Sequence, residues 1–365
     1  MADKVRIGII GTGQIGKAHI RRYAEILEAE IVALCDIRED EVGRVAAEHG
    51  VSATYTDYHQ LLARDDIQAV DVCLHNRLHA PVTIEALEAG KDVYCEKPMS
   101  WTYAEARAMY ETAKRLGRKL HIQLSTIYRL ETRAARRLLD EGHLGRVYYA
   151  KCYAYRRRNR PFVDGYGSAQ FVSKETAGGG TLLDTAVYTL GRMMYLLDAP
   201  EVLTVCGSAY QETAMYEDRR QLSGYNVEEL GIALARLAGG VTLFLESSWA
   251  MQAGPPEGDH VVGSQGGVRL DPFTYYTTLA DMEMDGTFDL KDAERRWHSV
   301  NPLVEAYDES QKHWVWAQLG RVPLLDTARF ALRASQITEG VYLSAQLGHE
   351  VSAAEIEAAP AGAGR

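Results

Sequence analysis

Apolar positions in the first third of the chain alternate between short strand-like runs and helix-like stripes. Val5–Ile10 is a compact apolar run, and apolar side chains between Ile15 and Leu27 follow at helical spacing. Further strands are expected at Ile31–Cys35, Ala69–Leu74, Asp92–Cys95 and Lys119–Leu124. Strands that alternate with helices are typical of a parallel sheet with crossover helices, so we predict an α/β domain over residues 1–124.

Later in the chain the strands become longer and follow one another through turns. Such strands are expected at Val147–Tyr155, Val202–Ala209, Val227–Leu237 and Val241–Trp249. Helices are expected at Thr102–Gly117, which opens with a Thr-x-x-Glu capping box, and at Glu131–Glu141, Thr181–Leu197 and Asp326–Leu347. We therefore predict an α+β domain over residues 125–347, built on a large, mainly antiparallel open sheet, and a C-terminal tail over residues 348–365, loose from Ala358 on.

Length and composition fit a globular protein. A chain of 365 residues with 46% hydrophobic residues has room for about two domains. No apolar run approaches the roughly 18 residues of a membrane span, and the N-terminus leads into a strand too soon for a signal peptide. We expect a soluble, cytoplasmic protein with no membrane partner.

The charge balance excludes further partners. A net charge of −10 argues against nucleic acid and anionic membranes, which need a basic face; Arg156–Arg160 is the local exception. The five cysteines are scattered without a C-x-x-C pair, so we expect them to be reduced, buried and inert. The histidines show no H-E-x-x-H pattern, so no metal site is predicted.

A glycine-rich motif follows the first strand and opens the first helix. It reads Gly11-Thr12-Gly13-Gln14-Ile15-Gly16, and its backbone N–H groups can face a pyrophosphate at the helix N-terminus. Asp36 ends the second strand about twenty residues later, where a carboxylate can accept a hydrogen bond from a ribose 2′-hydroxyl. This context predicts a Rossmann dinucleotide site and favours NAD over NADP, although Arg38 could instead pair with a 2′-phosphate.

Lys97 lies in the segment Val93–Pro98, at the end of a predicted strand. Ligands of doubly wound sheets bind at the carboxyl ends of the strands. Lys97 could therefore reach the nicotinamide ribose or donate to a substrate hydroxyl; the alternative is a solvated strand end.

The second domain supplies two further polar groups. Asp184 and Tyr188 lie four residues apart on the predicted helix and share a face at the edge of its apolar stripe. They could line a cleft, or they could form a buried tyrosine–aspartate pair.

Several of these segments together resemble the Gfo/Idh/MocA family of oxidoreductases. The motifs that carry the resemblance are Gly11–Gly16, Asn76–Ala80, Ala89–Pro98, Glu141–Gly145 and Gly178–Asp184. The resemblance covers almost the whole chain and implies a Rossmann domain followed by a domain whose open sheet often forms the oligomer interface. It thus implies a homo-oligomer, a dimer or a tetramer. By the same resemblance Lys97 and Asp184 are catalytic and Lys97–Pro98 is a cis peptide.

Two positions depart from the family pattern. Many relatives have a histidine where this chain has Tyr188, and many have a proline where His75 stands. The acid/base would then be a phenol, whose pKa an adjacent Lys97 ammonium would lower. We expect Tyr188 to take the hydroxyl proton, assisted by Lys97, while a hydride passes to the nicotinamide and Asp184 orients the substrate.

The candidate binding residues form two sets. Around the cofactor we expect Gly11, Thr12, Gly13, Gln14, Ile15, Gly16, Asp36, Ile37, Arg38, Leu74, His75, Asn76, His79, Glu96, Lys97 and Gln123. Around the substrate we expect Lys97, Arg156, Arg158, Tyr166, Asp184 and Tyr188. The arginines could recognise an acidic group on a carbohydrate, or they could form a solvated or interfacial strand end.

Three functions stay open at this point. The leading one is a dehydrogenase or reductase of a sugar, glycoside or cyclitol. A second is a glycoside hydrolase that uses NAD for transient oxidation and elimination, and a third is a non-catalytic cofactor sensor. Tyr110 and Lys114 also form the Y-x-x-x-K pattern of short-chain dehydrogenases, but Tyr110 shares an apolar helical stripe, so we expect it in the core.

Overall fold

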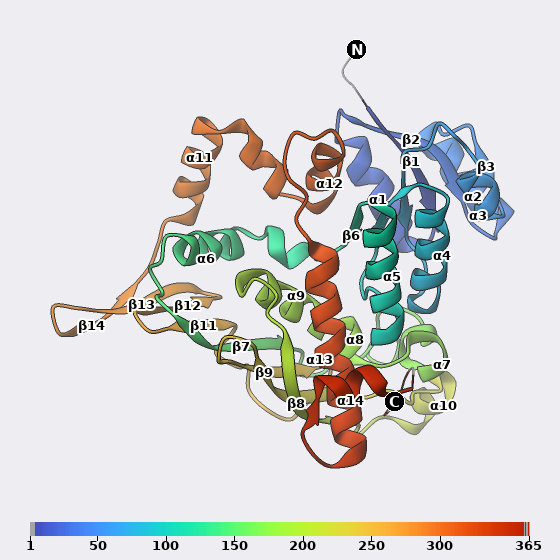
Figure 1. The fold of residues 1–365 in the computed structure, drawn as a ribbon. Coiled ribbons are helices and arrows are strands. Elements are labelled where there is room, and N and C mark those ends of the chain that lie inside the picture. The colour runs from blue at the N-terminus through green and yellow to red at the C-terminus, as the bar shows by residue number, and fades with distance from the viewer. Residues whose placement is uncertain (1–3, 361, 363, 365) are drawn as a thin grey trace. The chain divides into compact units, whose positions relative to one another are not determined.

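The computed structural model describes residues 4–360, 362 and 364, and the chain folds into two compact units. Unit 1 comprises Met1–Ser100, Ala106–Ser125 and Arg296–Ala328. Its six strands pair in parallel in the order β3-β2-β1-β4-β5-β6 (Figure 1). Their bounds are Val5–Ile10 (β1), Ala29–Cys35 (β2), Thr54–Tyr55 (β3), Ala69–Val72 (β4), Asp92–Cys95 (β5) and Leu120–Ile122 (β6). The predicted parallel sheet is confirmed.

The helices between these strands are Gln14–Ala24 (α1), Glu39–His49 (α2), Tyr58–Leu62 (α3), Asn76–Glu88 (α4) and Tyr103–Leu116 (α5), and the 3-10 turn Ser125–Tyr128 (η1) follows β6. The start of α5 follows the predicted capping box. The Thr102 hydroxyl accepts the Glu105 N–H, and the Glu105 carboxylate accepts the Thr102 N–H, both at 3.2 Å. Two N–H groups that the helix leaves open are thereby satisfied.

A late segment of the chain completes unit 1. The 3-10 turn Pro302–Tyr307 (η3) and helix Ser310–Gln318 (α12) belong to the segment Arg296–Ala328, which lies within the range 125–347 expected for the second domain. Trp314 is fully buried in the apolar cluster that also contains Ile20 and Tyr23 of α1. Burial of this indole explains why the segment is part of unit 1, because an aromatic side chain removes a large apolar area from water.

Unit 2 comprises Trp101–Glu105, Thr126–Arg295 and Arg329–Arg365 and contains a nine-stranded sheet. The order is β14-β13-β12-β11-β7-β10-β9-β8-β15, in which β7 and β10 run parallel and the other pairs antiparallel. The predicted, mainly antiparallel sheet is confirmed. Its strands are Val147–Tyr155 (β7), Val202–Tyr210 (β8), Leu230–Leu237 (β9), Val241–Ser248 (β10), His260–Gly263 (β11), Gly266–Leu270 (β12), Phe273–Leu279 (β13), Met282–Gly286 (β14) and Val351–Ser352 (β15).

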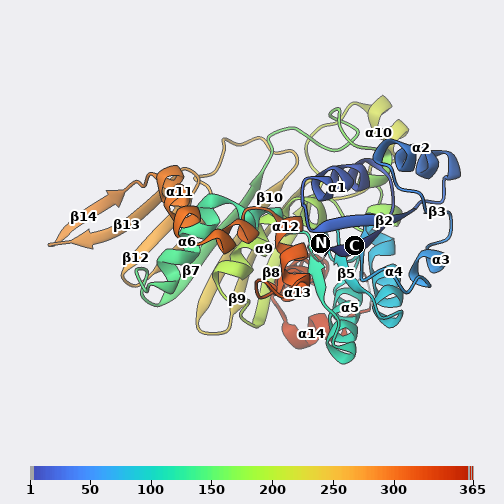
Figure 2. The same cartoon turned by 90° about the horizontal axis from the view of Figure 1, so that it is seen from above.

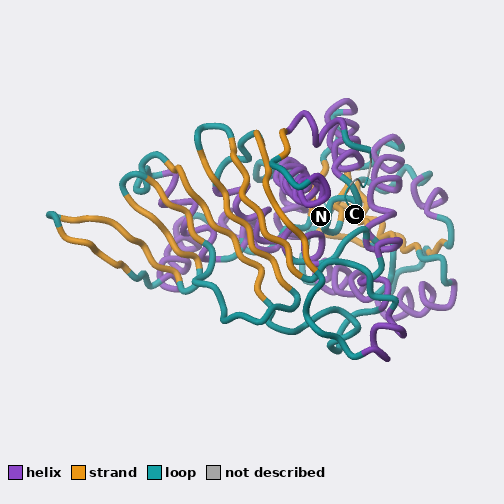
Figure 3. Tube along the Cα trace, turned by 90° about the horizontal axis from the view of Figure 1, so that it is seen from below, coloured by secondary structure: helices purple, strands orange, loops and turns teal. Residues whose placement is uncertain are grey.

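Helices of unit 2 cover one face of this sheet. Seen from above, α6 and α9 lie over the strands (Figure 2), and from below most strands lie in front (Figure 3). The remaining elements are Leu130–Asp140 (α6), Ala169–Val172 (η2), Lys174–Ala177 (α7), Thr181–Asp184 (α8), Ala186–Leu196 (α9), Glu217–Ser223 (α10), Leu290–Val300 (α11), Thr327–Leu347 (α13) and Ala353–Ala358 (α14).

The expected single helix over 181–197 is two helices, so that prediction is wrong in this detail. Thr185, with φ −107° and ψ −37°, is the C-cap of α8 and the N-cap of α9. The Thr185 hydroxyl donates to the Thr181 carbonyl at 3.0 Å and contacts the Ser247 hydroxyl at 3.1 Å. Threonine hydroxyls that bond the preceding turn compete with the helix ladder. Asp184 and Tyr188 therefore belong to different helices.

Part of the expected C-terminal tail is ordered. Val351–Ser352 pairs with β8 in the sheet, and Ser352 and Glu355 form a capping box at the start of α14. Residues 361, 363 and 365 of the expected tail, and residues 1–3 of the expected leader-free N-terminus, lie outside the described residues.

Burial corrects two further expectations. All five cysteines are free, and four are buried, but Cys206 is exposed because its position in β8 points to the uncovered face of the sheet. Tyr110 is half-buried rather than fully in the core, and its hydroxyl donates to Asp326 at 3.3 Å. Within the described part of the chain, every helix is too short or too polar to cross a membrane.

Candidate functional site

The glycine loop between β1 and α1 is shaped for close backbone approach. A Cβ at Gly11 would lie 2.3 Å from the Cys73 carbonyl oxygen, and one at Gly16 would lie 2.0 Å from that of Gly11, so neither position has room for a side chain. Gly13 differs, because nothing lies within 4 Å of its Cβ position. The loop is therefore packed on its inner side and open at Gly13.

Helix α1 begins directly at this opening. Gly13 is its N-cap and provides no side-chain cap, so the first N–H groups remain available to an anion. An open glycine beside uncapped N–H groups is the arrangement that a dinucleotide pyrophosphate requires. The residues present thus fit the cofactor that the glycine motif predicts.

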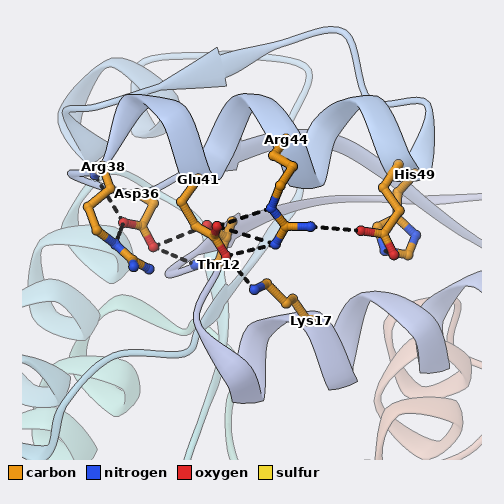
Figure 4. Close-up of polar contacts among 8 residues, drawn as sticks. Thr12, Lys17, Asp36, Arg38, Glu41, Arg44 and His49 are labelled. Carbon is orange, nitrogen blue, oxygen red and sulfur yellow. Dashed lines mark hydrogen bonds and ion pairs between the residues drawn. The ribbon is translucent and has the colours of Figure 1, made fainter.

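Asp36 at the end of β2 is held in place from two sides (Figure 4). Its Oδ2 accepts the Thr12 N–H at 2.9 Å and the Thr12 hydroxyl at 3.1 Å, and its Oδ1 accepts the Arg38 N–H at 3.1 Å. Burial raises the pKa of this carboxyl, but the bonds from Thr12 and Arg38 outweigh it and lower the pKa overall. The Arg38 guanidinium lies 3.4 Å from Oδ1, so in this structure it pairs with the carboxylate.

Nearby cations on α1 and α2 are paired as well. Glu41 bridges the two helices through ion pairs with Lys17 and with Arg44, the latter at 3.0 Å (Figure 4). These pairs lower the pKa of Glu41, with the hydrogen bond from Arg44 as the largest cause. The carboxylates of α2 thus neutralise the basic side chains beside the glycine loop.

The remaining cofactor candidates of unit 1 follow the carboxyl ends of neighbouring parallel strands. Leu74 and His75 lie between β4 and α4, and Asn76 is the first residue of α4; His75 is exposed and is the N-cap of α4. Gln123 is buried after β6, and its N–H donates to the Cys95 carbonyl at 2.9 Å. The exposed Ile37 follows Asp36 after β2. Unit 1 therefore gathers these residues at one edge of its sheet, where ligands of such sheets bind.

His79 lies beneath this edge, and both of its ring nitrogens contact backbone carbonyl oxygens. It is 1% exposed; Nδ1 lies 2.7 Å from the Pro98 carbonyl oxygen and Nε2 3.0 Å from that of Leu74. Burial lowers the pKa of this imidazole. Its side chain ties the segment after β4 to the segment after β5.

Lys97 is half-buried after β5, in the cis peptide Lys97–Pro98 that the resemblance implies. The Lys97 N–H donates to Glu96 Oε2 at 3.0 Å. Glu96 is itself buried, with Oε1 2.9 Å from His19 Nε2. The turn that carries Lys97 is thus held by a side chain from α1.

His19, Asp71 and Cys73 form a buried group that sequence reasoning missed. His19 lies on α1; of its partners, Asp71 lies on β4 and Cys73 directly follows β4, both far away in the sequence. The donor atoms of the three lie within 4.8 Å of one another, close enough for a metal ion. Hydrogen bonds already account for their contacts, and the expectation of no metal stays a prediction.

In unit 2, Arg156 joins Asp184 and Tyr166. Its guanidinium lies 3.9 Å from Asp184 Oδ2, donates to the Tyr166 hydroxyl, and stacks 5.2 Å from the Tyr166 ring centroid. The Tyr188 carbonyl accepts the Thr126 hydroxyl at 2.6 Å, which fixes the backbone at this position. Three of the expected substrate residues are therefore brought together.

Arg158 and Arg160 of the same arginine run contact carboxylates. Arg158 lies 3.5 Å from Asp164 and 5.7 Å from the Tyr216 ring centroid. Arg160 is 0% exposed and donates to Asp164 at 2.9 Å and to Glu229 at 3.0 Å. Burial alone lowers the Arg160 pKa, but these carboxylates raise it overall. Arg160 is thus a structural ion-pair residue that anchors the loop after β7.

A second missed residue supports the segment that carries Asp184. Glu228 is buried and accepts the N–H groups of Gly180 and Leu182 at 2.9 and 3.0 Å and the Tyr342 hydroxyl at 2.8 Å. A carboxylate at a helix N-terminus satisfies N–H groups that would otherwise be unpaired. Glu228 therefore fixes the start of α8.

Comparison with known proteins identifies the family of this chain. Residues 5–124 match the Gfo/Idh/MocA model described as an oxidoreductase family with an NAD-binding Rossmann fold, and residues 132–269 match the Gfo/Idh/MocA C-terminal domain. The chain belongs to the Gfo/Idh/MocA family. This Gfo/Idh/MocA protein is an NAD-dependent oxidoreductase, which confirms the predicted family, enzyme class and cofactor.

Individual proteins similar to this Gfo/Idh/MocA oxidoreductase are named as dehydrogenases. The D-glucoside 3-dehydrogenase of Escherichia coli is 32% identical over 284 residues, 76% of this chain and 80% of that protein. The inositol 2-dehydrogenase of Pseudomonas savastanoi is 30% identical over 197 residues, about half of each chain at 53% and 55%. A solved levoglucosan dehydrogenase in complex with NADH and levoglucosan is 18% identical, with a TM-score of 0.76 over 96% of this chain and 100% of that one, which shows a common fold.

Proposed function

We propose that this oxidoreductase transfers a hydride between NAD and a hydroxyl or ketone carbon of a sugar, glycoside or cyclitol. The observation that carries the substrate class is the 32% identity to a D-glucoside 3-dehydrogenase over 76% of the chain. The inositol 2-dehydrogenase and levoglucosan dehydrogenase relatives support the same class. Bound NAD supplies the hydride acceptor or donor.

Side chains of the protein would take the hydroxyl proton and orient the substrate. Tyr188 takes the proton of the reacting hydroxyl, Lys97 stabilises the phenolate and donates to the substrate oxygen, and Asp184 orients the substrate. The contact of Arg156 with Asp184 supports an ionised, oriented carboxylate there. Lys97 belongs to unit 1 and the other two to unit 2, so their joint action is part of this proposal.

Three variants test these roles: Tyr188→Phe, Lys97→Ala and Asp184→Ala. Each should lower kcat by about 100-fold or more, the usual cost of removing an acid/base or orienting group. Tyr110→Phe is the matched control, because its phenol lies in the unrelated helix α5 and should leave turnover unchanged. Near-wild-type hydride transfer in all three variants would refute the assignment.

One assay separates the reaction classes. Glycosides, free sugars and cyclitols, with and without an acidic group, are incubated with NAD or NADP while nicotinamide absorbance and sugar release are followed separately. Stoichiometric NADH supports the dehydrogenase, whereas sugar release without net NADH identifies an NAD-dependent hydrolase. Cofactor binding without turnover of any substrate would leave the cofactor sensor, which the presence of Lys97, Asp184 and Tyr188 disfavours.

The uncovered face of the unit 2 sheet supports a homo-oligomer. Cys206, Leu234 and Phe244 form a cross-strand row on that face, and Leu234 is 46% exposed. An exposed apolar row on a sheet commonly marks a protein contact. Leu234→Glu should shift the mass measured by light scattering towards the protomer, whereas Leu27→Glu, on the most exposed leucine of unit 1, should not.

A reducing compartment, the cytoplasm, fits the free cysteines. All five are unpaired, as is usual for proteins of the cytosol. Cell fractionation checks this assignment, and recovery from an oxidising compartment would contradict it.

A further inference from the structure

His19 lies between two carboxylates in the interior of unit 1. It is 1% exposed; Nδ1 lies 2.9 Å from Asp71 Oδ2, and Nε2 lies 2.9 Å from Glu96 Oε1. Cys73 donates to the other Asp71 oxygen at 3.3 Å. The function proposed above gives His19 and Asp71 no part, yet two buried carboxylates are costly unless something compensates them.

The hydrogen bonds indicate which groups carry protons. Both Glu96 oxygens act as acceptors, Oε1 from His19 and Oε2 from the Lys97 N–H, and both Asp71 oxygens accept from His19 and Cys73. Acceptor oxygens at opposite ring nitrogens need two N–H donors, and only an imidazolium has both. The geometry therefore describes an imidazolium between two carboxyl groups.

The electrostatic surroundings agree with this protonation. Burial lowers the pKa of His19, but Cys73 and Asp71 raise it by more, to well above its ordinary value. Burial raises the pKa of Glu96, and the hydrogen bond and charge of His19 bring it below its ordinary value. The other titratable groups against this site are Cys73, Tyr23 and Tyr94; burial raises their pKa values, and they are neutral.

We propose that His19 is a positioning residue for Lys97: it holds Glu96 in place, and Glu96 in turn holds the backbone of Lys97. The proposal rests on the function above, in which the Lys97 ammonium contacts the substrate. His79 secures the other side of the same turn through the Pro98 carbonyl. A shift of the turn would move the Lys97 side chain with it, while the glycine loop at the start of α1 would keep its shape.

Glu96 also brings a buried negative charge next to the Lys97 backbone. Glu96 and Lys97 attract each other through charge. Negative charge that is screened little by water favours the ammonium form of a nearby lysine. The same group that fixes Lys97 thus keeps it charged for contact with a substrate oxygen.

The protonation state of His19 is measured first, by NMR of the wild-type protein with isotope-labelled histidine. His19→Gln identifies the His19 signals by their loss. Both ring nitrogens should be protonated at neutral pH and above, where a solvent-exposed histidine is neutral. A neutral His19 ring at pH ~7.5 would overturn the proposal.

Steady-state kinetics then test the positioning role. His19→Gln should lower kcat by about 10- to 100-fold, the range expected when a reacting group is displaced, while the NAD dissociation constant changes less than about 3-fold. Asp71→Asn, which keeps the shape and removes one charge, should give a smaller loss in the same direction. His49→Gln, on α2, is the matched control and should change neither constant. Wild-type kcat in both His19→Gln and Asp71→Asn would refute the proposal.

A readout at Lys97 separates this proposal from the function on which it rests. Isotope-labelled methyl groups on the lysines, assigned with Lys97→Arg, report the Lys97 environment without any turnover. The Lys97 signal should move in His19→Gln and stay in His49→Gln; an unmoved signal would refute the coupling. If the signal moves but Lys97→Ala keeps full activity, the positioning stands and the catalytic role of Lys97 falls.

Discussion

Two glycines of the same loop should respond differently to an added methyl group. In Gly16→Ala the new Cβ would lie 2.0 Å from the Gly11 carbonyl oxygen, a backbone atom that cannot swing aside. We expect a loss of at least about 3 kcal/mol of unfolding free energy, the upper range for overpacking, and a Tm lower by roughly 5 °C or more. Gly13→Ala meets nothing within 4 Å, so its cost should stay near the ~1 kcal/mol of a poorer N-cap residue.

NAD binding should respond to Gly13→Ala more than stability does. We expect the pyrophosphate to approach the open side of Gly13, so Gly13→Ala should weaken NAD binding by at least about 10-fold in a protein of near-normal stability. Calorimetry measures the NAD dissociation constant, and thermal unfolding measures stability. Gly43→Ala is the control, since this exposed glycine inside α2 has free space; it should gain about 0.5–1 kcal/mol and bind NAD normally. Wild-type NAD affinity in Gly13→Ala, or wild-type Tm in Gly16→Ala, would refute the reasoning.

Further predictions concern acid stability, cofactor choice and the start of α8. Burial lowers the pKa of His313 to about 4, and its Nε2 accepts the Leu325 N–H at 2.9 Å, so the folded protein excludes a proton that the unfolded chain binds below pH ~6.5. Between pH ~7.5 and ~4.5 this should remove roughly 2–3 kcal/mol of unfolding free energy, a loss that urea titrations of His313→Gln should lack. Asp36→Asn should reduce the preference for NAD over NADP by about 10- to 100-fold in dissociation constants, because a carboxylate no longer repels the 2′-phosphate; an unchanged ratio would contradict the assignment. Glu228→Gln should cost about 1–3 kcal/mol in thermal unfolding, since the Gly180 N–H loses its charged acceptor, and no change in Tm would contradict it.

Local pattern predicts three strands at their observed bounds, but it predicts none of β3, β11, β12, β13, β14 and β15. Val5–Ile10, Asp92–Cys95 and Val147–Tyr155 begin and end where the apolar runs predict. Each is bounded by glycine or polar residues, and burial of a strand requires apolar side chains at the positions that face the core.

The sequence pattern does not predict features that depend on partners far away along the chain. The Thr185 hydroxyl contacts Ser247 of β10, and the role proposed for His19 depends on Asp71 of β4 and on Glu96, which follows β5. A histidine within an apolar stripe looks the same in a sequence whether its neighbours are methyl groups or carboxylates. Only the sheet register brings these partners together.

The late position of Trp314 has a consequence for how the protein is made. The core of unit 1 includes this indole, yet the strands it covers are finished by Ile122. At about 5–20 residues per second, a ribosome needs on the order of 10–40 s to add the intervening stretch. During that interval the nascent sheet exposes the apolar surface that α12 will cover, so chaperones have a defined window in which to act. A fragment that ends near residue 124 would keep this surface exposed permanently and should aggregate.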